Sequence, residues 1–218
     1  MTHHATRRKC LLLCLAGLAT TAVAAAQEAP VAALDSLLGD TRTMSADVAQ
    51  VIVESDGGVL EESVIAMHMK RPDGFYWETL EPFPELVVTN GKLLWNYQPD
   101  LEQVVVEPWD SDRSELAAQL LQGQTETLSR DYVIERLSEE GASLSEFRLR
   151  PLAGDSIYAQ ISISFVGPDL DTIHLRQTNG EQTVWRFSNV RRNEPLHDDL
   201  FEFEPPPGIE VIENEQVP

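Results

Sequence analysis

The sequence has little cysteine and little histidine. Its two cysteines, Cys10 and Cys14, lie near the N-terminus, in a segment with the layout of a cleaved secretory signal peptide. Processing would therefore leave no disulfide and no cysteine ligand for a metal. Of the five histidines, His68, His174 and His197 lie beyond that segment, and no two of them have the spacing of a helical metal pair.

Catalytic motifs are also lacking. The sequence contains no GxSxG nucleophile turn, no HExxH pair, no phosphate-binding loop and no dinucleotide fingerprint. Adjacent acidic pairs such as Glu61-Glu62 fall in predicted strands or turns, where neighbouring side chains face opposite sides and are poorly placed to share a proton. We therefore expect neither an enzyme nor a cofactor. A catalytic triad assembled only in space stays open at this point.

Basic residues are scarce. Sixteen Lys and Arg stand against 36 Asp and Glu, which gives a formal net charge of −20. Such a charge disfavours nucleic acid and anionic lipid headgroups as partners. It favours a basic partner, although simple solubility or a salty habitat explains it equally well.

The N-terminus has the three parts of a signal peptide. Arg7, Arg8 and Lys9 precede a short apolar run over 11–19, and Ala24–Ala26 supplies small residues before Gln27. The apolar run is too short for a permanent membrane span. We therefore predict cleavage after Ala26, secretion of the chain, and a single mature domain over 27–218.

Most of the remaining chain alternates between apolar and polar residues, which is typical of half-buried strands. Ile65, Met67 and Met69 share one face of such a strand, and Asn90-Gly91 is a strong hairpin signal. The ranges that we expect to form strands are 46–55, 59–70, 75–79, 86–89, 92–98, 103–107, 132–137, 146–152, 157–165, 172–177 and 183–190, with an edge strand or extended tail over 201–211. We count these as about ten antiparallel strands.

Two regions favour helices. Leucines recur at helical spacing over 30–40, where Gly39 ends the run, and the strand pattern stops between Asp110 and Asp131. Ser114 could cap a helix that carries Leu116, Leu120 and Leu121, and a second short helix would include Leu128. A sheet this large tends to curl or close, and the helices are the only elements that could cover its inner side. We therefore predict a mainly β fold, an incomplete, half-open antiparallel β-barrel covered by short α-helices; a two-sheet sandwich is the alternative.

The densest set of motifs lies between Lys70 and Gln103. Residues 70–77 read KRPDGFYW, residues 90–97 read NGKLLWNY, and Glu102-Gln103 follows. The ordered set, together with Gln50 and a tail over 201–208 that reads FEFEPPPG, resembles the outer-membrane lipoprotein carrier protein (LolA) family over essentially the whole chain beyond the signal peptide. Departures from the family are Val48, which stands where an aromatic residue is common, and Gly74, which stands where a leucine is common.

The resemblance implies a function and partners. It implies a chaperone in the periplasm of a Gram-negative bacterium. Such a chaperone takes acylated outer-membrane lipoproteins from an inner-membrane ABC transporter and delivers them to an outer-membrane receptor (LolB-like). We expect a monomer that binds neither nucleic acid nor a metal. The alternatives are a lipoprotein receptor or sensor of the same fold, a passive structural β-protein, and, from another class, a periplasmic lipid hydrolase.

The resemblance also implies roles for particular residues. Arg71 matches a family arginine that hydrogen-bonds backbone carbonyls of the helical lid and holds the empty carrier closed; from the sequence alone it is equally a surface arginine before a turn. We expect the acyl-chain cavity and its lid to be formed by Phe75, Trp77, Met67, Met69, Leu34, Leu37, Leu38, Leu120 and Leu121. Each of these could instead be an ordinary core residue.

Overall fold

One large sheet makes up most of the molecule. The computed structural model describes residues 19–109, 120 and 125–214. The strands are β1 (Thr43–Val53), β2 (Val59–Lys70), β3 (Gly74–Glu81), β4 (Glu85–Asn90), β5 (Leu93–Gln98), β6 (Gln103–Pro108), β7 (Tyr132–Arg136), β8 (Leu144–Pro151), β9 (Tyr158–Val166), β10 (Asp169–Gln177), β11 (Gln182–Arg192) and β12 (Glu210–Glu213). All twelve belong to a single sheet in the order β12-β6-β5-β4-β3-β2-β1-β11-β10-β9-β8-β7. The two-sheet sandwich is therefore excluded.

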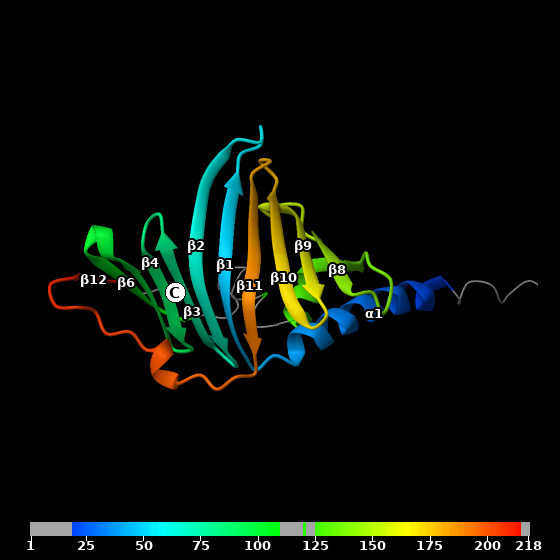
Figure 1. The fold of residues 1–218 in the computed structure, drawn as a ribbon. Coiled ribbons are helices and arrows are strands. Elements are labelled where there is room, and N and C mark those ends of the chain that lie inside the picture. Colours follow the sequence, from blue (N-terminus) through cyan, green and yellow to red (C-terminus); the bar gives the residue numbers. More distant parts are fainter. Residues whose placement is uncertain (1–18, 110–119, 121–124, 215–218) are drawn as a thin grey trace, which may run out of the picture.

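The sheet curls but does not close, as Figure 1 shows, and its edge strands are β7 and β12. The prediction of an incomplete barrel is confirmed. Two details of it are wrong: the strands number twelve rather than about ten, and β12 pairs with β6 in the parallel direction. A parallel pairing between a C-terminal segment and a strand a hundred residues earlier leaves no local turn signal in the sequence.

A tight turn joins β4 to β5 at the predicted position. At Asn90-Gly91 the side-chain Oδ1 of Asn90 accepts a hydrogen bond from the Lys92 backbone N–H at 2.9 Å, and Gly91 has a φ of 84°. A Cβ at Gly91 would also lie only 2.6 Å from Cβ of Asp73 in the neighbouring turn. Both the left-handed backbone and the close approach require glycine at this turn.

Helices α1 and α3 and two short 3-10 helices accompany the sheet among the elements whose bounds the structure describes. The N-terminal helix α1 (Ala19–Gly39) ends at the predicted glycine but begins earlier than the predicted range 30–40, and it continues through Pro30. The predicted short helix around Leu128 is α3 (Thr125–Asp131), whereas Ser114, Leu116 and Leu121 lie outside the described residues. The 3-10 helices are η1 (Pro99–Leu101) and η2 (Asp198–Phe201). Figure 1 shows α1 crossing the ends of β8 to β10.

Different segments of the chain pack against the two faces of the sheet. The inner face, defined here as the one that bears Met67 and Phe75, packs against α1, Leu120 and Leu128 in one large apolar cluster. On the opposite, outer face a smaller cluster around Val88, Trp95 and Val104 is covered by the C-terminal segment through Phe203 and Ile209. The predicted lipid site therefore belongs to the inner face.

Candidate functional site

Alternation along β2 and β3 builds the inner face. Ile65, Met67 and Met69 are each 1% exposed or less, whereas the residues between them point to the outer face. On the neighbouring strand, Phe75 lies opposite Met69 and Trp77 lies opposite Met67. The two aromatic rings stack with centroids 6.0 Å apart. The four residues that we predicted to line the cavity thus form one contiguous surface.

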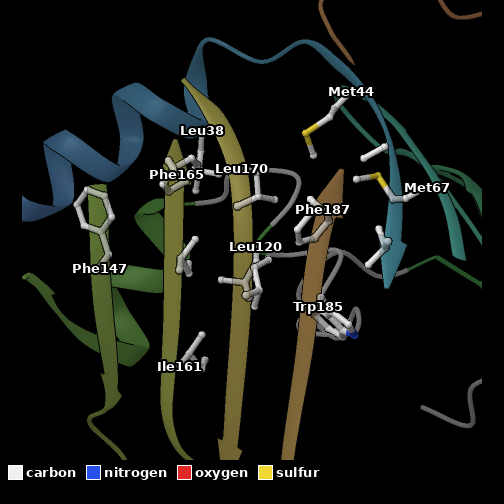
Figure 2. Close-up of a cluster of buried hydrophobic side chains, with 14 of the residues drawn as sticks. Leu38, Met44, Met67, Leu120, Phe147, Ile161, Phe165, Leu170, Trp185 and Phe187 are labelled. Atoms are coloured by element: carbon white, nitrogen blue, oxygen red, sulfur yellow. The ribbon is translucent and has the colours of Figure 1, made fainter. Parts of the chain in front are cut away.

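The predicted lid leucines lie on the same surface. Leu34 and Leu38 of α1 and Leu120 are buried in the inner-face cluster, and Leu37 is partly buried against it. Leu121 falls outside the described residues. Figure 2 shows Leu38 and Leu120 among inner-face side chains of β8 to β11, including Phe165 and Leu170. Eight of the nine predicted cavity and lid residues are therefore brought together, while their role in binding lipid stays a prediction.

Arg71 joins the sheet to the end of α1. Its Nη2 donates a hydrogen bond to the backbone carbonyl oxygen of Leu38 at 2.8 Å. That carbonyl belongs to the last turn of the helix, where the macrodipole favours a positive charge. Burial lowers the pKa of the Arg71 guanidinium, and the negative charge of Asp35 opposes that shift. Nε of Arg71 is buried and has no hydrogen-bond partner in the described part of the chain.

A second set of contacts ties the same helix end to β11. Arg192 Nε donates to Thr41 Oγ1 at 2.9 Å, and Asn193 Nδ2 donates to the Asp40 carbonyl oxygen at 3.0 Å. Asn193 Oδ1 in turn accepts the backbone N–H of Arg42 at 2.7 Å. The sequence reasoning missed these residues. The only available signal was Arg191-Arg192-Asn193 at the end of a strand, where Asn often adopts the positive φ of 60° that it has here.

The inner-face aromatics extend beyond those predicted. Trp185 of β11 packs edge-on against Trp77 with ring centroids 5.4 Å apart, and its Nε1 donates to Gln50 Oε1 at 2.6 Å. Phe147, Phe165 and other apolar residues of β8 to β11 continue the same surface. The clean alternation of apolar residues along 157–165 was the signal that could have identified this half of the face.

The packing under α1 is tight, and open space lies further along the inner face. Between α1 and the sheet, a cavity of about 10 Å³ is bordered by Leu38, Met44 and Met69. A groove of about 300 Å³ opens beside Trp77 and Trp185. Its lining residues are Gln50, Glu61, Phe75, Trp77, Thr79, Phe83, Glu85, Val87, Asn96 and Trp185. An acyl chain could therefore enter the space under α1 only if the helix moved.

Neither a metal cluster nor a membrane-spanning helix is found in the part of the chain that the structure describes. Within residues 19–109, 120 and 125–214, no three or more His, Cys, Asp or Glu residues come close enough to hold a metal ion. None of the helices in those ranges is long and apolar enough to cross a membrane.

Comparison with known proteins gives the family. The family model described as "Outer membrane lipoprotein carrier protein LolA" matches residues 39–204. An outer-membrane lipoprotein carrier protein of Hahella chejuensis is 34% identical over 201 residues, which cover 92% of this chain and 96% of that protein. One from Alcanivorax borkumensis is 32% identical, with 84% and 89% covered. A solved LolA superfamily protein from Nitrosomonas europaea has 13% identity and a TM-score of 0.44, with 82% of this chain and 98% of that chain covered. The chain therefore belongs to the LolA family of outer membrane lipoprotein carrier proteins.

Proposed function

We propose that this protein binds the acyl chains of outer-membrane lipoproteins and carries them through the periplasm. One observation carries the proposal: the apolar inner face and the leucines of α1 form a single cluster that is held together at its edge by Arg71. A helix packed in this way can move away from the sheet as a unit and expose an apolar surface to an acyl chain. The relatives in Hahella chejuensis and Alcanivorax borkumensis are named outer-membrane lipoprotein carrier proteins, which supports the carriage of lipoproteins.

Burying an acyl chain on the inner face releases more free energy than exposing the leucines of α1 costs. An acyl chain gains about 0.8 kcal/mol for each CH₂ that leaves water, so a sixteen-carbon chain gains on the order of 12 kcal/mol. Exposing Leu34 and Leu38 costs about 1.5–3 kcal/mol each. One chain therefore outweighs the loss of the lid contacts, and the closing contacts keep the net affinity low enough for the cargo to be released.

We assign to Arg71 the role of holding α1 closed over the inner face. Its hydrogen bond to Leu38 can form only while the end of α1 lies against the corner between β2 and β3. An interaction present in one state alone shifts the balance towards that state by its full free energy. Arg71 would therefore weaken lipid binding and favour release.

Location and partners complete the proposal. Cleavage after Ala26 would leave Gln27–Gly39 of α1 as the start of the mature chain and would place the carrier in the periplasm. An inner-membrane ABC transporter would supply the lipoprotein, and an outer-membrane receptor would accept it. The protein would act on its cargo by binding and would catalyse no reaction.

A co-purification experiment tests the carrier function. The protein, purified from the periplasm without detergent, should hold a lipoprotein that detergent removes, and the same lipoprotein made without its acyl chains should not be retained. Failure to retain any acylated lipoprotein, with the fold intact by circular dichroism, would contradict the proposal. An esterase assay on the same preparation separates a carrier from a lipid hydrolase.

A further inference from the structure

A single polar side chain interrupts an apolar row on the inner face. The register places Met67, Trp77, Val87, Asn96 and Val105 opposite one another on β2, β3, β4, β5 and β6. Asn96 is therefore flanked on both sides by valine, and the next residue along that row is a tryptophan. Burying a carboxamide on this apolar face costs free energy unless another group forms a hydrogen bond with it.

The Asn96 side chain has an unmet hydrogen-bonding capacity. Its Oδ1 is buried and accepts no hydrogen bond from any residue that the structure describes. Leaving a buried acceptor unpaired costs roughly 1–3 kcal/mol, so each such atom calls for a physical explanation. Asn96 also lines the groove of about 300 Å³ beside Trp77 and Trp185. The unpaired acceptor thus belongs to a side chain that lines a space a ligand could occupy.

The groove combines an apolar wall with a polar, acidic margin. Trp77, Trp185 and Val87 supply surface for a hydrocarbon chain, and Phe83, which is 68% exposed, stands at its edge. Glu61 and Glu85 line the same groove, and each already accepts a hydrogen bond from a neighbour, Ser63 and Gln98 respectively. Two carboxylates repel an anionic headgroup, so the groove disfavours a free fatty acid. A neutral head that donates a hydrogen bond fits all of these features.

We infer that this groove is a subsite for the secondary amide that joins an acyl chain to a polypeptide, with Asn96 Oδ1 accepting the amide N–H. The inference rests on the proposed function, since it assigns a position to one part of the acylated cargo. Acyl chains of lipoproteins are attached through amide and ester linkages, and only the amide offers a donor. The Asn96 NH₂ group can donate in return to a linkage carbonyl. The subsite would therefore fix where the chains end and the polypeptide begins.

Two nearly isosteric probes test the assignment. N-methylpalmitamide carries the amide N–H, whereas methyl palmitate has an oxygen in its place. We expect the lipid-free protein to bind the amide roughly tenfold more tightly than the ester, which corresponds to one hydrogen bond to an otherwise unpaired acceptor. Palmitate at pH 7.5 should bind more weakly than either probe because of Glu61 and Glu85.

The variant Asn96→Leu, similar in volume, isolates the contribution of the carboxamide. It should bind the ester as tightly as the wild type does, lose the preference for the amide, and show a higher thermal midpoint because the unpaired acceptor is gone. Tyr97→Phe is the matched control: it is the next residue of β5, faces the C-terminal segment on the outer face, and should keep the tenfold preference.

The outcomes separate the two proposals. Equal binding of amide and ester by the wild type would overturn the amide subsite and leave the carrier function standing; this readout does not depend on the variant folding. Retention of the preference in folded Asn96→Leu would also overturn the subsite. Binding of neither probe by the wild type would remove the carrier function itself.

Discussion

Nη2 of Arg71 lies 2.8 Å from the carbonyl oxygen of Leu38, so one hydrogen bond connects the corner after β2 to the last turn of the helix that covers the inner face. Its donor is a half-buried cation, and its acceptor belongs to the segment that must move if lipid is to reach the apolar face. Residues 40–42 connect α1 to β1, and Asp40 and Thr41 among them are hydrogen-bonded separately to the end of β11. The helix end can therefore serve as a hinge while the Arg71 contact opens.

Arg71→Leu should leave the fold intact and impair release. We expect the free energy of unfolding to stay within about 1 kcal/mol of the wild-type value, because the lost hydrogen bond is offset by removing a partly desolvated cation. Retention of bound lipoprotein should rise, and transfer to the receptor should fall by about tenfold for each 1.4 kcal/mol that the closed state loses. A reconstituted handover assay measures both quantities.

The control for this prediction is Arg186→Leu, which removes an exposed arginine on the outer side of β11. It should release cargo as the wild type does. Normal transfer by Arg71→Leu would show that the hydrogen bond to Leu38 has no part in release.

A photo-reactive phenylalanine analogue at position 75 should crosslink to bound lipoprotein. Phe75 is 5% exposed, belongs to the same buried cluster as the leucines of α1 and lines the groove, so an acyl chain bound on the inner face should contact it. The same analogue at Tyr97, on the outer face, should give no adduct. Complete absence of adducts from position 75, with cargo still bound, would place the acyl chains elsewhere.

Stability should decline on mild acidification because of His68. Burial, followed by the positive charge of Arg191, lowers the pKa of His68 below its ordinary value of 6.5, although Glu78 and Asp47 act in the opposite direction. The folded state thus binds the proton less readily than the unfolded chain does. The stabilisation is fully present above pH 6.5 and is lost as the pH falls from there towards the folded pKa.

His68→Gln should remove that dependence while keeping a polar partner for Ser45, whose Oγ lies 2.8 Å from His68 Nδ1. Urea unfolding at several pH values between 8 and 5 measures the effect. The difference in unfolding free energy between wild type and variant should shift in favour of the variant as the pH falls below 6.5. Parallel curves would show that the histidine does not contribute.

Much of the fold follows from local pattern. The alternation of Ile65, Met67 and Met69 predicted their common burial, and Asn90-Gly91 predicted its turn, because pleat and turn geometry depend only on neighbouring residues. The pairing of β12 with β6 could not be predicted in this way. It joins residues about a hundred positions apart and depends on the path of the C-terminal segment across the outer face.

The candidate site, like the fold, could be predicted from the sequence only where local pattern determines it. Six of the eight predicted cavity and lid residues that the structure describes are buried, whereas Leu37, Trp77 and Arg71 are partly buried. The family resemblance had implied a role for each of them. Asn96 and Trp185 were missed as site residues. Their importance arises from register across several strands and from contact between β3 and β11, neither of which a single stretch of sequence displays.

The departure from the family pattern at Gly74 has a structural counterpart in Phe201. A Cβ at Gly74 would lie 3.1 Å from Cγ of Phe201 and 3.0 Å from the Lys70 carbonyl oxygen. Phe201 is 3% exposed and lies in η2, which starts the segment that covers the outer face. The glycine therefore leaves room for this ring, and a leucine there would displace it.

A double-mutant cycle tests this pairing. Gly74→Leu should destabilise the protein by about 2 kcal/mol through overpacking against Phe201. Phe201→Ala alone should cost about 3–4 kcal/mol because it leaves a cavity under η2. In the double variant the leucine can occupy the vacated space, so the two costs should fall short of their sum by at least about 1 kcal/mol. Urea unfolding measures all four proteins, and simple additivity would mean that the glycine and the ring do not compete for the same space.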